Sequence, residues 1–354
     1  MRRPPKTKTE EVIRTLLIDG NALFKTGYHG AITDYNTKGE HIGGIYQFIT
    51  IVRKLISEKP YHRVFVFWDG KFSGKLRYNF YSDYKANRNK DYINGTEPED
   101  VNQLLERLVV QEYLEELFIR QIEDEIVESD DFIAYFCCTK KENEQITICS
   151  NDRDLCQLIN NDVTMYLCDK KVYVTVDNYH EHFKHHFKNV ALIKIISGDS
   201  SDNIKGVKGV KETTLLKHFP FLSERESSLD EILDVASLLN SERIESKKKP
   251  LSALTNILES VTDGIQGKDL YKINKKLVDL TNPLISDSAM ETVELLKHNT
   301  LDPDERGIKN VYNLMRRDGL DTRIANNASE YLFPFKELIE REKKMFNEKN
   351  LLNE

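Results

Sequence analysis

Three short apolar segments, each followed closely by an aspartate, constrain the fold of this chain more than any other sequence feature. The segments cover residues 15–18, 64–68 and 145–149, and the aspartates are Asp19, Asp69 and Asp152. Longer segments with apolar residues at helical spacing lie between them, over residues 44–56 and 101–117. Near-continuous apolar strands that alternate with helices are typical of a parallel sheet covered on both faces. The sequence therefore predicts an α/β fold.

The chain changes character near residue 186. Before that point two more short strands are expected, at 163–167 and 172–176. After it, residues 198–209 are rich in glycine, serine and aspartate, and a helix is expected over 212–219. The charged segment 241–250 is typical of a loop, and the segments that follow it have only helical patterns, ending in a charged helix from Arg341. A chain of 354 residues exceeds the roughly 150 of an average domain, which favours two domains.

Composition excludes several classes of protein. Hydrophobic residues make up 39% of the chain, enough for a packed core, so a globally disordered protein is excluded. No apolar stretch approaches the ~18 residues that span a bilayer, and the first residues lack the apolar region of a signal peptide. Five cysteines without a C-x-x-C pair suit reduced thiols. We therefore expect a cytoplasmic protein without a membrane partner.

Charge is strongly segregated along the chain. The net charge is −7, yet residues 71–90 carry six basic side chains against one acid, and residues 97–131 carry thirteen acids against two bases. Such runs are usually solvated helix faces. The alternative is that one part of the chain attracts a polyanion while another concentrates carboxylates.

Acidic residues recur at the ends of the predicted strands and at one predicted helix start. Ligands of an open parallel sheet gather beyond the carboxyl ends of its strands, so these side chains are expected to meet at one rim. A single aspartate in such a place usually makes a turn or a helix cap, and acids at a helix start complement its dipole. Nine such carboxylates are too many for that explanation alone. They are Asp19, Asp69, Glu128, Asp130, Asp131, Asp152, Asp154, Asp199 and Asp202.

Mutual repulsion among these carboxylates requires cations between them. Carboxylate oxygens suit hard divalent ions, and Mg²⁺ is the expected one, with two or more ions bound and Mn²⁺ as a substitute. Zinc is disfavoured because cysteine and histidine are not spaced as ligands. The histidine-rich patch over residues 180–186 is interpreted as a solvated helix face.

Six motifs follow one another along the chain. They are Leu16-Leu17-Ile18-Asp19-Gly20-Asn21, Phe67-Trp68-Asp69-Gly70, Tyr84-Lys85-Ala86-Asn87-Arg88, Glu128-Ser129-Asp130-Asp131, Asn151-Asp152-Arg153-Asp154 and Gly198-Asp199-Ser200-Ser201-Asp202-Asn203. In this order they resemble the motifs of the 5′-nuclease superfamily, which includes flap endonucleases, the 5′–3′ exonuclease domains of bacterial DNA polymerase I, and phage flap nucleases and ribonuclease H. The resemblance covers about residues 12–220 and is weak beyond them. In size the chain is most similar to the free-standing bacteriophage enzymes.

The resemblance implies a PIN-like α/β core with a helical arch and a helix–two-turn–helix element that grips duplex DNA. The expected division is a basic tail over 1–11, a nuclease core over 12–185 with the arch at about 71–106, a duplex-binding domain over 186–300 and a helical region over 301–354. The nine carboxylates fall on the family's metal-site acids. Lys85 and Arg88 fall on its catalytic arch-base cations, and Arg77 on a further basic position expected to contact DNA.

The duplex-binding element carries added positive charge. Gly206 and Gly209 match the family's pattern, whereas lysines stand where the family usually has two prolines and a glycine, at Lys205, Lys208 and Lys211. Glycines let backbone N–H groups approach phosphates, and the lysines add salt-sensitive attraction. The changes leave open whether the turn still holds the K⁺ ion that some relatives bind. Tyr84 is expected either to stack on a splayed terminal base or to be a half-buried arch tyrosine.

The resemblance implies a monomeric structure-specific 5′ nuclease that hydrolyses DNA phosphodiesters at flaps, nicks or 5′ ends by a two-metal mechanism, in replication and in primer or flap removal. If a phage encodes the chain, its location is the host cytoplasm. One alternative is mainly a ribonuclease H acting on RNA–DNA hybrids. A second is a non-catalytic structure-specific DNA-binding protein, against which the retained acids argue. A third is a PIN-type ribonuclease toxin, which would not need the lysine-rich element at 205–211.

Overall fold

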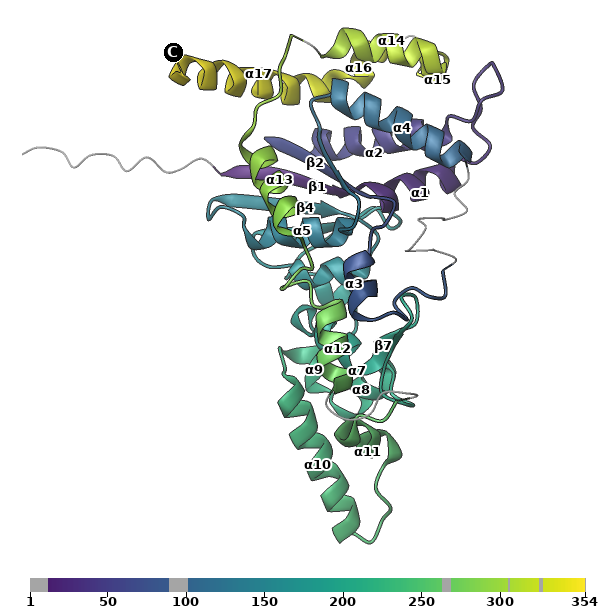
Figure 1. Ribbon diagram of the computed structural model, residues 1–354, viewed down its shortest axis with the longest axis vertical. Helices are drawn as coiled ribbons and strands as arrows, with labels where there is room; N and C mark the ends of the chain where they lie inside the picture. Colours follow the sequence, from purple (N-terminus) through teal and green to yellow (C-terminus); the bar gives the residue numbers. More distant parts are fainter. Residues whose placement is uncertain (1–11, 89–100, 263–268, 305, 325–326, 354) are drawn as a thin grey trace, which may run out of the picture.

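The computed structural model describes residues 12–88, 101–262, 269–304, 306–324 and 327–353 (Figure 1). A six-stranded sheet lies at its centre. Its strands are β1 Ile13–Asp19, β2 Arg63–Asp69, β3 Arg120–Asp124, β4 Glu144–Cys149, β5 Val163–Leu167 and β6 Val172–Val174. The strand order is β3-β2-β1-β4-β5-β6, and all neighbours are parallel except β5 and β6. The sheet is therefore the mostly parallel one that the sequence predicted.

Each central strand buries both of its faces, which explains its continuous apolar sequence. Leu16 and Ile18 belong to the core on one face, and Leu17 to the core on the other. The first face is covered by α1 Gly20–Gly30, α2 Gly43–Glu58 and α4 Val101–Glu116. The opposite face is covered by α5 Ser129–Cys138, the 3-10 helix η1 Arg153–Leu158 and α13 Asp287–His298.

A third, smaller hydrophobic core lies below the sheet in Figure 1, around Leu215, Ile257 and Leu270. The short helices α6 Tyr179–His182 and η2 Phe187–Asn189 precede it in the chain, and their aromatic side chains pack in the same core as α5. The elements of the smaller core are α7 Val190–Ser197, the hairpin β7 Gly198–Asp199 and β8 Ile204–Lys205, α8 Glu212–His218, α9 Phe221–Glu224, α10 Leu229–Glu245, α11 Ser252–Glu259 and α12 Asp269–Val278. The short helix α3 Lys75–Phe80 lies between this region and the sheet.

The C-terminal helices return to the first face of the sheet. They are α14 Ile308–Asp318, α15 Leu320–Arg323, α16 Ala328–Tyr331 and α17 Phe333–Asn353. Phe335, Leu338 and Ile339 of α17 are buried in the same core as α2 (Figure 1). The C-terminal helices thus form an outer layer over the first face of the sheet. Among the described residues, no helix combines the length and the apolar character that crossing a membrane requires.

Several sequence predictions need correction or fall outside the described residues. The segment 241–250 is not entirely a loop, because α10 continues to Glu245. The strand β3 and the hairpin of β7 and β8 were not predicted. The basic tail 1–11 lies outside the described residues, as does the middle of the expected arch, residues 89–100. The remaining proposed domain boundaries stay predictions.

Candidate metal and nucleic-acid site

The site lies where β1, β2 and β4 end beside one another. Asp19 closes β1 and Asp69 closes β2, and these strands are neighbours in the sheet. Asp19 caps α1 by accepting a hydrogen bond from the Ala22 N–H at 3.0 Å, and it also accepts one from the Ser150 hydroxyl at 2.8 Å. Ser150 directly follows β4 and belongs to the turn that carries Asp152. The strand-end rim predicted from the sequence is therefore present.

The helix α5 brings its acidic first turn to the same rim. The backbone N–H of Ser129, the first residue of α5, donates to Asp69 Oδ1 at 2.9 Å. Asp130 follows in the first turn and repels Asp19, Asp69 and Asp152 electrostatically. We call Asp19, Asp69, Asp130 and Asp152 the aspartate cluster.

The aspartate cluster carries strong mutual repulsion. Burial, followed by repulsion from Asp152, Asp19 and Asp69, raises the pKa of Asp130 well above its usual value. Burial and repulsion from Asp69 raise the pKa of Asp19 to about 7. Asp130 Oδ1 is buried and accepts no hydrogen bond from the described residues. A buried carboxylate oxygen without a donor is a position that a cation would satisfy.

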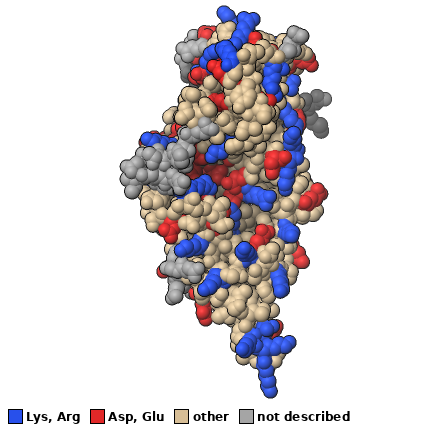
Figure 2. All heavy atoms as spheres, turned by 90° about the vertical axis from the view of Figure 1, so that its right-hand side faces the viewer, with Lys and Arg blue, Asp and Glu red and all other residues tan. Residues whose placement is uncertain are grey.

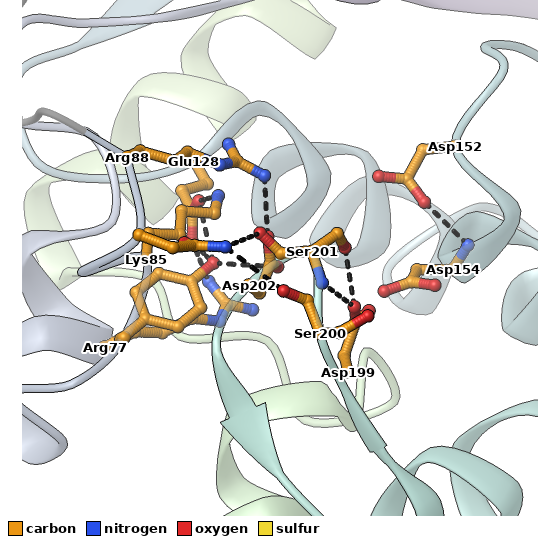
Figure 3. Close-up of polar contacts among 12 residues, drawn as sticks. Arg77, Lys85, Arg88, Glu128, Asp152, Asp154, Asp199, Ser200, Ser201 and Asp202 are labelled. Carbon is orange, nitrogen blue, oxygen red and sulfur yellow. Dashed lines mark hydrogen bonds and ion pairs between the residues drawn. The ribbon is translucent and has the colours of Figure 1, made fainter. Parts of the chain in front are cut away.

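Four other acids at the site form ion pairs with the protein's own cations, and Figure 3 shows those on the side of Lys85 and Arg88. Glu128 accepts a hydrogen bond from Arg77 Nη1 at 2.6 Å and forms an ion pair with Lys85. The other pairs join Arg88 to Asp202 at 2.7 Å and Lys194 to both Asp154 and Asp199. Although burial opposes ionisation, Lys85 and Arg77 lower the pKa of Glu128 to about 2.

Lys194 was not singled out from the sequence, although a signal exists. It is the one charged residue in the apolar run 191–196, and its pKa is raised by Asp154 and Asp199 against the effect of burial. One lysine cannot fully neutralise two carboxylates. Burial and repulsion from Asp152 raise the pKa of Asp154 to about 7, whereas Lys194 lowers that of Asp199 to about 2 despite its burial.

The two groups of acids meet around a small pocket of about 20 Å³, lined by Glu128, Asp130, Asp154 and Asp202. A larger cavity of about 890 Å³ borders Asp152, Asp154 and Asp199 on the side of α7 and α8. In Figure 2 acidic side chains gather in a hollow at mid-height, with lysine and arginine side chains around it. Within the described residues, however, no three acidic, histidine or cysteine side chains form a ready-made ligand set.

Several of the carboxylates form ion pairs with protein cations instead of facing one another, because like charges repel. The donors nevertheless fit a hard divalent ion, since they are carboxylate oxygens and one of them is buried without a partner. The assignment of these acids as metal ligands remains a prediction.

Asp131 does not join the other acids. Its Oδ1 accepts hydrogen bonds from Arg77 Nη2 at 3.0 Å and from the Leu284 N–H at 2.9 Å, and its Oδ2 pairs with Arg77 Nη1. It is 1% exposed. Asp131 is therefore the counter-ion of Arg77 in this structure, and its assignment as a metal ligand stays a prediction.

Arg77 and Tyr84 also need correction. Arg77 was expected to contact DNA, but only 5% of it is exposed, and its guanidinium joins α3 to α5 and, through the Leu277 carbonyl at 2.9 Å, to α12. Tyr84 is 3% exposed and donates to Glu128 at 3.0 Å. Of its two interpretations the structure supports the buried tyrosine, because its ring is packed in the smaller core and cannot stack on a base.

The segment that carries Lys85 and Arg88 packs on the loop that carries Asp202. The Lys85 N–H donates to the Asp202 carbonyl at 2.8 Å, and Asn203 Nδ2 donates to the Asp83 carbonyl at 2.7 Å. Lys85 itself has a left-handed backbone, with φ of 53°. In Figure 3 Arg77, Lys85 and Arg88 lie on one side of the site, and Asp152 and Asp154 on the other. The cations thus face the acids across the site.

The expected duplex-binding turn lies between α7 and α8. Lys205, Lys208 and Lys211 are exposed along it. Gly209 has φ of 73° and open space at its Cβ position, as an approach to phosphate requires. Gly206 is needed for another reason: a Cβ there would lie 2.0 Å from the carbonyl carbon and oxygen of Ser197.

The carbonyl oxygens that would bind K⁺ in this turn already accept hydrogen bonds. The carbonyls of Val207 and Lys208 already accept hydrogen bonds from the Val210 N–H at 3.0 Å and from Asn256 Nδ2 at 2.9 Å. A K⁺ ion would have to share these carbonyl oxygens with their hydrogen-bond donors. The K⁺ site remains a prediction.

The histidine patch is not a solvated helix face. The helix α6 ends at His182, and His185 lies beyond it, hydrogen-bonded to the Tyr179 hydroxyl at 2.9 Å and to Glu212 at 3.0 Å. His182 and His185 line the larger cavity. The helical spacing of the histidines in the sequence was misleading because the helix has only four residues.

Comparison with known proteins agrees with this geometry. Residues 14–186 match a family described as 5′–3′ exonuclease, N-terminal resolvase-like domain. The chain is 29% identical over 277 residues to DNA polymerase I of Bacillus subtilis, a match that covers 75% of this chain but only 30% of that protein. It is also 29% identical over 249 residues to a 5′–3′ exonuclease of Mycoplasmopsis pulmonis, covering 69% of this chain and 79% of the relative.

Two solved structures share the fold. One is T5 5′-exonuclease with bound zinc, with a TM-score of 0.57 and 17% identity, covering 86% of this chain and 97% of the other. The second is the bacteriophage T5 flap endonuclease in a pseudo-enzyme–product complex with DNA and metal ions, with a TM-score of 0.55 and 18% identity, covering 86% and 99%. The family match and the 5′–3′ exonuclease relatives, together with the sheet and its acidic rim, support a place for this chain in the 5′-nuclease superfamily.

Proposed function

We propose that this chain is a divalent-metal-dependent, structure-specific 5′ nuclease that hydrolyses DNA phosphodiesters at flaps, nicks or 5′ ends. The observation that carries the proposal is the aspartate cluster, in which a buried Asp130 oxygen without a hydrogen-bond partner faces a rim bordered by Lys85 and Arg88. The named relatives support it, since they include 5′–3′ exonucleases. The chain spans 30% of the length of DNA polymerase I from Bacillus subtilis, so only the nuclease part of that relative bears on this activity.

Two groups of side chains would hold the ions. The first is the aspartate cluster with Glu128, and the second is Asp154, Asp199 and Asp202. Two bound Mg²⁺ ions, or Mn²⁺ in their place, would supply a nucleophilic water and neutralise the leaving oxygen. Lys194 and Arg88 neutralise part of the second group in this structure. These cations keep the rim folded when its negative charge is not otherwise balanced.

The chain's own cations would bind the scissile phosphate. Lys85 lies on Glu128, and its side chain is 15% exposed. The Lys85 ammonium group can exchange its ion pair with Glu128 for one with the incoming phosphate. It would then stabilise negative charge on the phosphate as a fixed hydrogen-bond donor. Arg88 is more accessible, with a side chain 49% exposed, and can offer two N–H groups to one phosphate. Arg77 and Tyr84 hold Glu128 in place during the exchange.

The lysines of the turn between α7 and α8 would bind the duplex next to the cleavage point, through its backbone and with little base specificity. We also propose a monomer that acts in replication, in primer or flap removal. All five cysteines are free thiols, which supports a cytoplasmic location.

The test is cleavage of a 5′-labelled flap duplex with Mg²⁺, and then with chelator added. Release of labelled product with Mg²⁺ alone is expected. Tight binding without cleavage would replace the proposal with a non-catalytic DNA-binding protein. Nicked duplex, blunt 5′ ends and an RNA–DNA hybrid belong in the same series. Faster cleavage of the hybrid than of every DNA substrate would make the chain mainly a ribonuclease H.

A further inference from the structure

A helical hairpin extends the duplex-binding region away from the acidic site. It consists of α10, α11 and the turn 246–251 between them. In Figure 1 the turn is the end of the molecule farthest from the sheet, beyond α7, α8 and β7. The space-filling view shows lysine and arginine side chains clustered at this end, on the same face as the acidic hollow (Figure 2). Residues 243–249 carry four cations, Arg243 and Lys247 to Lys249, against the single acid Glu245.

The basic turn has a defined structure. Arg243 accepts a hydrogen bond at its carbonyl from the Lys248 N–H at 2.7 Å, and its Nε donates to the Lys249 carbonyl at 2.9 Å. Asn240 closes the base of the turn, because its Oδ1 accepts from the Leu251 N–H at 2.9 Å while its Nδ2 donates to Thr255 at 3.2 Å. The three lysine side chains are exposed. Their backbone is therefore held in place while their ammonium groups face solvent.

The other end of α11 is joined to the lysine-rich turn between α7 and α8. The Lys208 N–H donates to the Val261 carbonyl at 2.8 Å, and Asn256 Nδ2 donates to the Lys208 carbonyl at 2.9 Å. The Tyr271 hydroxyl donates to the Ile257 carbonyl at 2.6 Å and fastens the same end of α11 to α12. The two sets of lysines thus belong to one connected body, with α11 between them as a spacer.

We propose that Lys247, Lys248 and Lys249 form a second phosphate-binding point, which contacts the backbone of the same duplex farther from the cleavage point. The proposal rests on the proposed function for the identity of the polyanion. The eight residues of α11 span about 12 Å at 1.5 Å per residue. At 3.4 Å per nucleotide along one strand, the hairpin reaches roughly four base pairs beyond Lys208.

Duplex DNA fits this arrangement better than a protein partner does. The lysines are point charges on flexible stems, which suit phosphates without specifying a sequence. In Figure 2 the basic side chains at this end of the molecule lie on the same face as the acidic hollow, so one straight rod could touch both. The exposed Leu238 and Ile244 of α10 are the features of the hairpin that a protein partner would use instead.

The experiment compares the wild-type chain with the triple variant Lys247→Gln, Lys248→Gln, Lys249→Gln. Its control is a variant with the same loss of charge at the opposite end of the molecule, Lys336→Gln, Lys343→Gln, Lys344→Gln on α17. Binding to nicked duplexes is measured in the presence of chelator. The duplex segment on each side of the nick is lengthened separately, one base pair at a time. The measurement is then repeated across a salt titration. Thermal unfolding midpoints verify that all three proteins are folded.

We call the triple variant of Lys247, Lys248 and Lys249 the tip variant. Wild type and control should gain affinity when the duplex on one side of the nick becomes about four base pairs longer than the length that Lys208 can reach. The tip variant should show no such gain in affinity. If all three lysines contact phosphates, the salt slope of the variant falls by ~2.7, so wild type loses ~40-fold more affinity than the variant between 50 and 200 mM salt. An unchanged length profile and salt slope in the tip variant would overturn the inference.

The same assays separate this inference from the proposed function. A wild-type chain that binds with the length step but does not cleave flaps in Mg²⁺ contradicts only the nuclease assignment. If wild type cleaves flaps and the tip variant has the same length profile and salt slope as wild type, only the second phosphate-binding point is contradicted. Absence of duplex binding by wild type would overturn both.

Discussion

Glu128 and Asp130 are two residues apart in the chain, yet their carboxylates lie in opposite electrostatic surroundings. Despite burial, Lys85 and Arg77 lower the pKa of Glu128 to about 2, so Glu128 stays ionised without any bound ion. No cation among the described residues pairs with Asp130, and burial together with three neighbouring aspartates raises its pKa well above the usual value. Of the two, Asp130 carries the repulsion that a divalent ion would relieve.

The variant Asp130→Asn tests this difference. Without metal it should be more stable than wild type, by ~1 kcal/mol, because the amide keeps the shape and removes one repelling charge. Cleavage should fall roughly 100-fold or more, as on loss of other preorganised electrostatic groups. The measurements are thermal unfolding in chelator and single-turnover cleavage, with duplex affinity as control. Cleavage at the wild-type rate would remove Asp130 from the site.

Arg77 and Arg88 form a matched pair of arginines with different expected roles. Arg77→Met leaves Asp131 buried without its cation and removes one of the two cations of Glu128, so it should reduce the free energy of unfolding by about 3–5 kcal/mol. Arg88→Met removes an exposed partner of Asp202 and should change stability by less than ~1 kcal/mol while weakening cleavage. Urea unfolding of both variants gives the comparison. A stable Arg77→Met protein with weakened DNA binding would restore Arg77 as a DNA contact.

At the scale of elements, the turn between α7 and α8 depends on two glycines for different reasons. Gly206 lies against the backbone of Ser197, whereas Gly209 needs only its left-handed φ of 73°. Gly209→Ala should therefore destabilise the protein by about 1–2 kcal/mol, the cost of that conformation for an L-residue. Gly206→Ala should cost more, because two backbone segments must separate. Thermal unfolding of the two variants decides this, and equal losses would contradict the close packing at Gly206.

Local signals explain which elements the sequence predicted. Strands β1, β2 and β4 are buried on both faces and so have continuous apolar sequences, and their terminal acids were assigned to one rim correctly. The end of α10 was missed because its exposed, charged residues have no apolar periodicity. The roles of Arg77 and Asp131 could not be predicted, since their partnership joins residues 54 apart in the chain and depends on where α3 meets α5.

At the scale of the whole molecule, the C-terminal helices complete the first face of the sheet. Arg120 of β3 and Glu342 of α17 form an ion pair in which the side chains are 2% and 0% exposed. Arg120 Nη2 also donates to the Asn299 carbonyl at 2.9 Å, just before the C-terminal region begins. A buried pair of this kind makes the sheet and α17 energetically dependent on each other, since either charge alone would be left without a partner.

A double-mutant cycle on this pair tests whether α17 unfolds together with the core. Arg120→Met should reduce the free energy of unfolding by about 3–5 kcal/mol, because Glu342 remains buried and charged. Arg120→Met with Glu342→Met should recover most of that loss, since two apolar side chains of similar length can fill the same space. Urea unfolding followed at Trp68, which is buried against the same core, reports on the sheet.

Additive losses in the double variant, or a separate early transition of the C-terminal helices, would show that α17 unfolds independently of the sheet. A single transition with strong coupling would show that the nuclease core includes the last helix of the chain.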